Sequence, residues 1–450
     1  MKVLHIPFTY FPDVPGGTEV YVASLARELA LRGTDSVIAA PTTVKGNSVY
    51  AVDGIRVHRL SMLTDELPLP VLYGAGDTQM RASVMKVIGS ERPDVVHFHS
   101  YTPRINGAVA QAVRASGTAV VVTYHTPSVT CQRGTLLRFD SIACDGRMMV
   151  GRCTACVLQQ NGVPRPAADL CARVPNAIGR AIRSRGLRGG VWTALQMTEL
   201  LRIRHDDARA YLDAADIVVA VAEWVRTLLI ANGLDSEKVI LCRQGASAVL
   251  ANREHDAPIG EDEDRPLRAV IVARLDAMKG IHLPLAALEG RPDLRISLDI
   301  YGSVQAEDEY VAAVRRQVGT DARVRLLPPV PPQNVVKVIS AYDLMLVPSQ
   351  VLETGPLVVL EAKAAGVPVI GTDLGGIAEL VHDDIDGQLV ELGSAAAWER
   401  VLERVISDRS IVNRWRTAIL PPPTMGGVAE EMNAIYRRVA RRLPHTAPTT

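Results

Sequence analysis

Short apolar runs that alternate with helix-like segments constrain the fold of this chain more than any other feature. Before residue 250 these runs include KVLHIPF (2–8), DVVHFH (94–99) and AVVVTYH (119–125). After a polar stretch the alternation starts again with RAVIVAR (268–274) and continues to VPVIGT (367–372). Repeated strand–helix alternation is typical of parallel sheets with crossover helices. We therefore predict an α/β chain of two Rossmann-like domains that face each other across a cleft.

The polar, acidic stretch ANREHDAPIGEDEDRP (251–266) is predicted to be a linker. It separates an N-terminal domain, residues 1–250, from a C-terminal domain, residues 267–424. A cysteine-rich insertion at about 131–204 interrupts the first domain, and a last helix with a tail occupies residues 425–450. Ligands of such sheets bind at the carboxyl ends of the strands, so the loops after the strands are the first candidates for a site.

Charge and composition restrict the possible partners. The chain carries 49 Lys and Arg residues and 49 Asp and Glu residues, a balance that argues against a nucleic-acid partner. The opening MKVLHIPFTYF does not resemble a signal peptide, and no apolar stretch reaches the length of a membrane span. We expect a cytoplasmic location, with peripheral contact at the inner membrane face left open. In the reducing cytoplasm, the six cysteines of the chain are expected to be free thiols or metal ligands rather than disulfides.

The segment RLDAMKG (274–280) follows the first strand of the second domain, where a ligand loop is expected. Arg274 and Lys279 can hold a diphosphate together, because a guanidinium fork and an ammonium both bind phosphate oxygens. Gly280 would allow the chain to turn into the next helix. A pair of solvated surface cations is the alternative.

The segment ETGPLVVLEAKAAG (353–366) predicts a short helix from Leu357 to Ala365, with a proline before it and a glycine after it. The amino end of this helix would suit an anion. Glu353 lies just before the helix and Glu361 about 8 Å inside it. Two carboxylates that faced a phosphate directly would repel it. Both are therefore better suited to accept hydrogen bonds from sugar hydroxyls on either side of the phosphate. The alternatives are a helix cap for Glu353 and a structural salt bridge for Glu361.

Two glycine pairs precede further helices, one in PGGTE (15–19) and one in GTDLGG (371–376). Gly16 and Gly17 have no side chain that could block a phosphate or a sugar. Neither segment is a GxGxxG motif, and plain turns remain the alternative.

These motifs together resemble those of the retaining glycosyltransferases of family 4, two-domain GT-B enzymes that use nucleotide-activated sugars. The resemblance rests on PGGTEVYVASLARELALRG, RPDVVHFHS, VARLDAMKG and ETGPLVVLEAKAAGVPVIGTDLGGIAELV. Glu353 and Glu361 match the family's E-x7-E signature, although ETGP replaces the commoner E-x-F-G. The resemblance covers residues 1–130 and 205–440, whereas residues 132–204 match less well. It also implies that the last helix packs back on the first domain.

The resemblance implies a role for each matching side chain. Glu361 would accept hydrogen bonds from the nucleotide ribose, and Glu353 would hold a hydroxyl of the donor sugar. Arg274 and Lys279 would bind the diphosphate and stabilise the charge that grows on it during transfer. His125, at the end of VVVTYH, matches the histidine that lines the reacting centre.

Backbone groups are implied as well. The N–H groups that would help to bind the diphosphate are those of Gly355, Leu357 and Val358. Gly16 and Gly17 would approach the phosphate from the other domain.

The resemblance implies a retaining transfer from a UDP-, GDP- or ADP-sugar without a catalytic metal. The acceptor would be a glycan, a lipid-linked sugar or a small molecule. Two enzymatic alternatives are a GT-B sugar-nucleotide epimerase and a sugar-phosphate synthase. A catalytically silent nucleotide-sugar binder that acts as an interaction module is a third.

The insertion begins with CQRGTLLRFDSIACDGRMMVGRCTAC, which places Cys131, Cys144, Cys153 and Cys156 in the spacing C-x12-C-x8-C-x2-C. Four thiolates can form a tetrahedral structural zinc site or hold an iron–sulfur cluster, and we expect zinc. Four reduced thiols are the alternative, and Cys171 could replace one ligand. Because the loop starts six residues after the matching histidine, it is predicted to shape the acceptor side of the cleft.

Two further patterns have ordinary explanations. His97 and His99 lie on the same face of a predicted strand, which could form a metal pair but more simply gives two strand-end histidines. Residues 173–209 contain eight arginines. They could form a membrane-surface helix near a lipid-linked acceptor, although a solvated face is the simpler interpretation.

Overall fold

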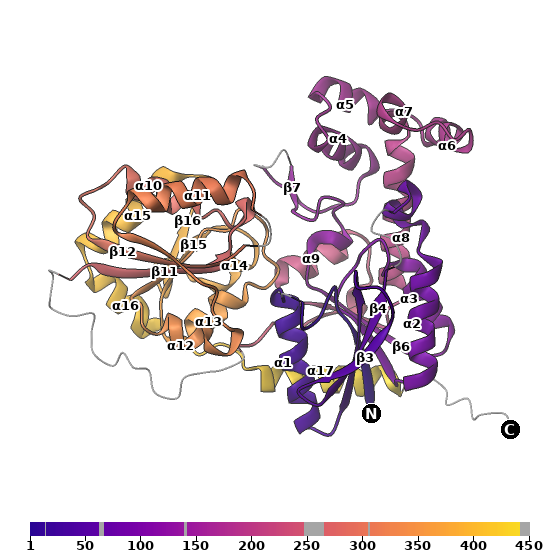
Figure 1. Ribbon diagram of the computed structural model, residues 1–450, viewed down its shortest axis with the longest axis horizontal. Helices are drawn as coiled ribbons and strands as arrows, with labels where there is room; N and C mark the ends of the chain where they lie inside the picture. Colours follow the sequence, from indigo (N-terminus) through magenta and orange to yellow (C-terminus); the bar gives the residue numbers. More distant parts are fainter. Residues whose placement is uncertain (14, 63–66, 139–141, 247–264, 305–306, 442–450) are drawn as a thin grey trace. The chain divides into compact units, whose positions relative to one another are not determined.

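The computed structural model describes residues 1–13, 15–62, 67–138, 142–246, 265–304 and 307–441. The chain forms two compact units, Met1–Cys242 with Val428–Thr450 and Arg243–Gly427 (Figure 1). Residues 251–264 of the predicted linker lie outside the described residues.

The predicted end of the first domain at residue 250 needs correction. Arg243–Ala246 already belong to the second unit, because Ala246 N–H donates to the Pro423 carbonyl at 2.8 Å and Met425 N–H to the Ala246 carbonyl at 3.1 Å. The last helix, α17 (Met425–Ala440), belongs to the first unit from Val428 onward.

The first unit is built on an eight-stranded sheet of order β10-β9-β6-β5-β1-β2-β4-β3, in which all neighbours are parallel except β3 and β4. Its strands are β1 (Lys2–Ile6), β2 (Asp35–Thr42), β3 (Ser48–Val52), β4 (Ile55–Ser61), β5 (Val95–Phe98), β6 (Ala119–Tyr124), β9 (Ile217–Ala220) and β10 (Val239–Leu241). The helices that cover it are α1 (Gly17–Leu31), α2 (Thr78–Glu91), α3 (Gly107–Ala115), α8 (Met197–Asp213), α9 (Glu223–Ala231) and α17. Short turns of helix lie at Val71–Ala75, Pro127–Val129 and Ser236–Lys238.

The cysteine-rich insertion, residues 131–204, forms a small helical projection of this unit (Figure 1). Its elements are β7 (Leu137–Arg138), β8 (Ile142–Ala143), α4 (Val150–Gln160), α5 (Arg165–Cys171), α6 (Asn176–Ser184), α7 (Gly190–Leu195) and the start of α8. Among the described residues, none of the helices combines the length and apolar character that a bilayer-spanning segment requires.

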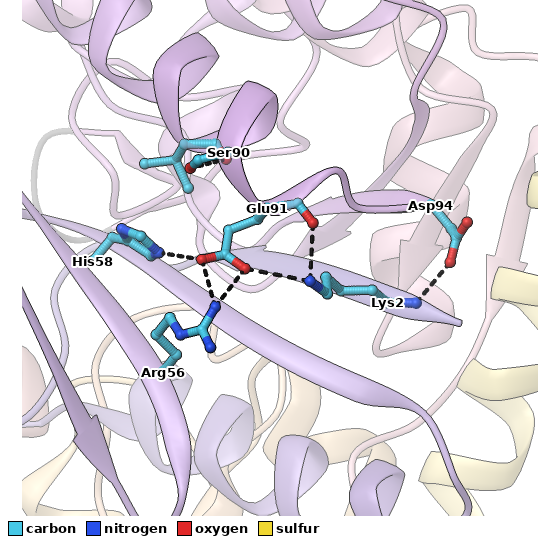
Figure 2. Close-up of polar contacts among 7 residues, drawn as sticks. Lys2, Arg56, His58, Ser90, Glu91 and Asp94 are labelled. Carbon is cyan, nitrogen blue, oxygen red and sulfur yellow. Dashed lines mark hydrogen bonds and ion pairs between the residues drawn. The ribbon is translucent and has the colours of Figure 1, made fainter. Parts of the chain in front are cut away.

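A buried carboxylate fixes the end of α2 to the sheet, as Figure 2 shows. Both carboxylate oxygens of Glu91 lie 2.9 Å from Nη1 of Arg56, and Oε1 lies 2.9 Å from Nε2 of His58. Lys2 Nζ donates to the Glu91 carbonyl at 2.9 Å. Burial would raise the pKa of Glu91, but hydrogen bonds from Arg56, His58 and Lys2 outweigh it and lower the pKa to about 2. Lys2 and Arg56 lie at the starts of their strands, away from the carboxyl ends where ligands of such sheets bind. We therefore interpret this network as structural.

The second unit is a six-stranded parallel sheet of order β13-β12-β11-β14-β15-β16. Its strands are β11 (Leu267–Arg274), β12 (Ile296–Ser303), β13 (Val324–Leu327), β14 (Leu344–Val347), β15 (Val369–Thr372) and β16 (Gly387–Val390). Its helices are α10 (His282–Glu289), α11 (Glu309–Thr320), α12 (Val335–Ile339), α13 (Leu357–Ala365), α14 (Gly375–Leu380), α15 (Ala395–Ser407) and α16 (Ser410–Ala418), with short turns at Ala277–Lys279 and Pro332–Asn334.

Both faces of this sheet are covered. Ala269 and Ile271 of β11 pack into one apolar cluster with α10, α11, α15 and α16, whereas Val270 packs into another with α12, α13 and α14. Burial on both faces explains why the strands are continuous apolar runs. The predicted α/β class and the two parallel-sheet domains are confirmed.

The direction of strand order reverses between β11 and β14 in the second unit and between β1 and β5 in the first. β11 and β14 are direct neighbours, with Ala269 opposite Leu344. Such a crossover leaves a crevice beyond the carboxyl ends of the two strands, where ligands of doubly wound sheets bind. The segments RLDAMKG and ETGP are therefore both in loops that begin at this edge.

Candidate active site

The loops after β11 and β14 are in direct contact. Gln350 N–H donates to the Met278 carbonyl at 2.7 Å. Gly280 has a φ of 64°, and a Cβ atom there would lie 2.1 Å from the Pro348 carbonyl oxygen. The close approach of the two loops therefore requires glycine at position 280. This is a second reason for glycine there, in addition to the turn that the sequence predicts.

Glu353 is held by cations at this contact. Lys279 Nζ lies 2.5 Å from Oε1 of Glu353, and Ser349 Oγ donates to the same oxygen at 2.9 Å. Burial raises the pKa of Glu353, but the charge of Lys279, the two hydrogen bonds and the charge of Arg274 hold it below its usual range. Glu353 is thus an ionised, oriented acceptor rather than a free carboxylate.

Arg274 is the last residue of β11, and its side chain is partly exposed at the same edge. Its Nη2 lies 3.3 Å from the carboxylate of Asp276, which also accepts the Lys279 backbone N–H at 3.2 Å. Since a lysine ammonium has three N–H donors, Lys279 can contact Glu353 and a phosphate oxygen at the same time. The structure places both predicted phosphate-binding cations on one loop.

The helix predicted between Leu357 and Ala365 has those bounds in the structure, as α13. Pro356 precedes it, and Gly366 ends it in the left-handed conformation with a φ of 70°. Leu357 and Val358 lie in its first turn, where backbone N–H groups have no acceptor within the helix. Gly355 packs so tightly that a Cβ atom would lie 2.2 Å from Oε1 of Gln244, which fixes the backbone just before the helix.

Glu361 lies in the second turn of α13 and is half-buried. Burial raises the pKa of Glu361 to about 7. Across the described ranges of the chain, no side chain or backbone group pairs with its carboxylate. The salt bridge considered from the sequence is therefore absent from the described residues, and the carboxylate can accept hydrogen bonds from a ligand.

The second glycine pair supports the Glu353 loop. Gly376 N–H donates to the Glu353 carbonyl at 2.7 Å, and a Cβ atom on Gly376 would lie 2.7 Å from that oxygen. Gly375 has a φ of 53°. These glycines are needed because α14 begins against the backbone of the loop, a long-range contact that the local sequence does not reveal.

In the first unit, Gly16 and Gly17 lie at the start of α1, as predicted. The Gly16 N–H already donates to Oε2 of Glu19 at 2.9 Å, and this carboxylate is buried. Gly17 is exposed and opens the helix. Sequence analysis missed Glu19, although a Glu three residues after a helix cap is a known capping pattern.

His125 is the first residue after β6, and its ring is buried in a chain of histidines. Its Nε2 lies 3.1 Å from Nδ1 of His99, whose Nε2 lies 3.0 Å from Nδ1 of His5. Burial lowers the pKa of His125 and of His5 to about 3, so both rings are neutral near pH 7. A neutral imidazole carries one proton, so in each contact one ring donates and the other accepts. His5, His99 and His125 therefore share one tautomer, with the proton either on Nδ1 in all three or on Nε2 in all three.

The possible metal pair of His97 and His99 can be judged from the same cluster. Ligand nitrogens of His5, His97 and His99 lie within 4.8 Å of one another. However, Nδ1 of His97 lies 2.7 Å from the Tyr436 hydroxyl and Nε2 lies 2.7 Å from the Thr123 hydroxyl. Because the imidazole nitrogens are already hydrogen-bonded within the protein, the ordinary structural interpretation is favoured.

The arginines of residues 173–209 largely make contacts within the chain. Arg202 Nε donates to the buried Glu199 carboxylate at 2.9 Å, and Arg180 and Arg183 lie within 4 Å of the same carboxylate. Arg204 packs over the Tyr101 ring at 4.0 Å. These contacts favour an intramolecular role for the arginines, and membrane contact stays a prediction.

The four cysteines predicted as metal ligands, Cys131, Cys144, Cys153 and Cys156, all line one pocket of the first unit. Cys171 is not among the residues that line it and packs instead against an apolar cluster of α4 and α8.

Sequence comparison identifies the family. The family described as "Glycosyl transferase 4-like domain" matches residues 16–245, and "Glycosyl transferases group 1" matches residues 252–419. The chain belongs to the family 4 glycosyltransferases. Together the two matches include both loops of the β11–β14 crossover and the start of α1.

Relatives of this glycosyltransferase agree with that assignment. A D-inositol 3-phosphate glycosyltransferase of Corynebacterium diphtheriae is 26% identical over 446 residues, covering 94% of this chain and 89% of its own length. Among solved structures, sucrose-phosphate synthase from Thermosynechococcus elongatus has a TM-score of 0.65 at 19% identity, covering 97% of this chain and 98% of its own. Anabaena HepE in complex with UDP and glucose has a TM-score of 0.60 at 15% identity, covering 97% and 99%. The fold is GT-B, as predicted.

Proposed function

We propose that this glycosyltransferase moves a sugar from a nucleoside-diphosphate sugar to its acceptor with retention of the anomeric configuration. The observation that carries the proposal is the contact between the β11 and β14 loops. It brings Arg274, Lys279 and Glu353 together where the strand order reverses, beside the loop that leads into α13.

In this proposal Arg274, Lys279 and the first turn of α13 bind the donor's diphosphate. Cleavage of the bond between sugar and diphosphate produces an oxocarbenium-like sugar and a leaving group with increased negative charge. Preorganised donors that face this charge stabilise the transition state, each by about 2.7–4 kcal/mol. Protein cations can therefore replace a catalytic metal ion in the departure of the nucleotide.

The two carboxylates have different environments and are given different roles. Glu353, ionised and fixed by Lys279, would accept a hydrogen bond from a hydroxyl of the donor sugar. Glu361, without a partner among the described residues, would accept hydrogen bonds from the ribose hydroxyls. Neither is assigned as a nucleophile, because both belong to the donor side and Glu353 is already neutralised by a lysine.

His125 is proposed to line the reacting centre as a neutral imidazole that hydrogen-bonds a sugar hydroxyl. Retention would then follow from attack on the same face that the nucleotide leaves. The proton of the acceptor hydroxyl would pass to the departing phosphate oxygen. This scheme needs no covalent glycosyl-enzyme intermediate.

The acceptor is proposed to be a sugar-containing or phosphorylated small molecule, or a lipid-linked sugar. The similarity to D-inositol 3-phosphate glycosyltransferases supports a phosphorylated polyol as the first compound to test. For the donor, UDP is the first nucleotide to test, because UDP and glucose occupy a solved structure with the same fold.

Calorimetric titration with UDP, GDP and ADP tests the donor half of the proposal. We expect one nucleotide to bind selectively and to lose affinity in the variants Arg274→Ala and Glu361→Ala. Arg315→Ala is the matched control, because Arg315 is exposed on α11 and pairs with Glu307 at 2.8 Å. Equal binding by all four proteins would refute the proposed site.

Product analysis separates the remaining alternatives. An epimerase would convert the nucleotide sugar without a second acceptor, and a silent binder would bind the nucleotide but leave the sugar donor intact. Transfer to an acceptor with the anomeric configuration of the donor, observed by NMR, supports a retaining transferase. Inversion would contradict the proposed mechanism.

A further inference from the structure

The four cysteines of the insertion converge from separate segments. Cys131 lies in the loop after β6, and Cys144 directly follows β8. Cys153 and Cys156 are three residues apart on α4, so their side chains lie on one face of the helix. All four cysteines line a single pocket of the insertion.

Cations surround the same pocket. Its lining includes four arginines, which are Arg133, Arg138, Arg147 and Arg152. Nη1 of Arg133 lies 3.5 Å from Sγ of Cys156, within hydrogen-bond reach of that sulfur. Asp145 pairs with Arg152 at 3.1 Å, and no carboxylate lines the pocket within the described part of the chain.

This charge pattern suits four thiolates that bind a metal centre. Four thiolates around a centre of charge +2 carry a net charge of −2, which the arginines would offset. Donors that point at ligand sulfurs are also the usual second layer around a metal.

We propose that Cys131, Cys144, Cys153 and Cys156 together bind a thiophilic metal centre that fixes the insertion. The centre would link the Cys131 loop and the β8 end to α4. β7 and β8 pair over only two residues each. The apolar cluster of the insertion lies instead on α4, α5 and α8.

Sulfur spacing distinguishes the two kinds of centre. With Zn–S bonds of about 2.3 Å, tetrahedral zinc brings four sulfurs to roughly 4 Å from one another. Among the described residues, the trio of ligand groups within 4.8 Å of one another consists of His5, His97 and His99, and the cysteine sulfurs do not form another. A four-iron cluster, in which each thiolate binds a different iron, does not need three sulfurs within that distance. The zinc expected from the sequence becomes the second choice.

Metal and sulfide analysis of the full-length protein, purified without oxygen and again after reconstitution with iron and sulfide, tests the proposal. We expect about four irons and four sulfides per chain, with broad visible absorption. About one zinc per chain would keep the four-thiolate site and assign it to zinc. Neither metal after both preparations would overturn the proposal.

Variants assign the ligands. Cys153→Ser and Cys156→Ser should each lower the bound metal severalfold, whereas Cys171→Ser, in the same insertion but away from the pocket, should retain it. Far-ultraviolet circular dichroism checks that each variant is folded. Equal metal content in all three folded variants would overturn the assignment of these ligands.

Discussion

Nζ of Lys279 and Oε1 of Glu353 are 2.5 Å apart, although 74 residues separate them in the sequence. This ion pair joins the loops that follow the two central strands of the second sheet. The pair keeps the carboxylate of Glu353 ionised and leaves Lys279 with further N–H donors for a phosphate oxygen. The proposed donor site depends on this pair more than on any other contact.

Replacing Lys279 with alanine should remove a phosphate donor and leave Glu353 without its cation. We expect kcat to fall about 100- to 1,000-fold, the usual effect of losing one such donor. Steady-state kinetics with the nucleotide sugar measure this effect. Lys337→Ala, an exposed lysine on α12, is the control and should leave kcat unchanged.

Glu361 should make donor binding depend on pH. Its pKa of about 7 means that the ionised form, the better hydrogen-bond acceptor, becomes dominant between pH 6 and 8. We expect nucleotide affinity to rise over this interval in the wild type and to stay flat in Glu361→Gln. Calorimetry at pH 6, 7 and 8 measures both, and parallel pH profiles would contradict the role.

The same carboxylate should reduce stability above pH 4.5. The unfolded chain loses this proton near pH 4.5 and the folded chain near pH 7, so stability falls between these values and then levels off. Glu361→Gln removes the effect and should gain about 1–2 kcal/mol at pH 8, allowing for partial solvent exposure. Urea unfolding of both proteins at pH 5 and 8 provides the comparison.

The histidine chain should control how His125 acts. His99→Phe removes the partner that selects the tautomer of His125, and one lost buried hydrogen bond costs about 1–3 kcal/mol. We expect kcat to fall about 10- to 100-fold with little change in KM for the donor. His205→Gln, a half-buried histidine of α8 outside the chain of rings, should retain activity. A change in KM alone would argue against this positioning role.

Glu91 should stabilise the first unit only when it is ionised. Its pKa is near 2 in the folded protein and 4.5 unfolded, so its contribution is complete above pH 4.5 and disappears as the pH falls toward 2. We expect Glu91→Gln to lose about 2–3 kcal/mol at pH 7 and much less at pH 2. Glu28→Gln, in an i,i+4 surface pair with Arg32, should lose about 0.5 kcal/mol or less.

Local sequence patterns were sufficient to predict the elements that carry the proposed donor site. The bounds of α13 follow from Pro356 and Gly366, because these residues act within one turn of the helix. The parallel sheets follow from apolar runs, since strands buried on both faces cannot alternate polar and apolar residues.

Contacts between distant segments could not be predicted in this way. The hydrogen bond from Gly376 to Glu353 and the one between His97 and Tyr436 depend on how elements pack, and no local pattern encodes them. The boundary at Cys242 was missed for a related reason. Ala246 joins the second unit through its contacts with Pro423 and Met425, far along the chain.

The most direct test of the account is a crystal structure of the protein with the nucleoside diphosphate that binds most tightly in calorimetry. We predict density beyond the carboxyl ends of β11 and β14, with phosphate oxygens in hydrogen-bond contact with Arg274 and Lys279 and ribose hydroxyls on Glu361. A nucleotide bound elsewhere, with these three side chains untouched, would contradict the proposed donor site.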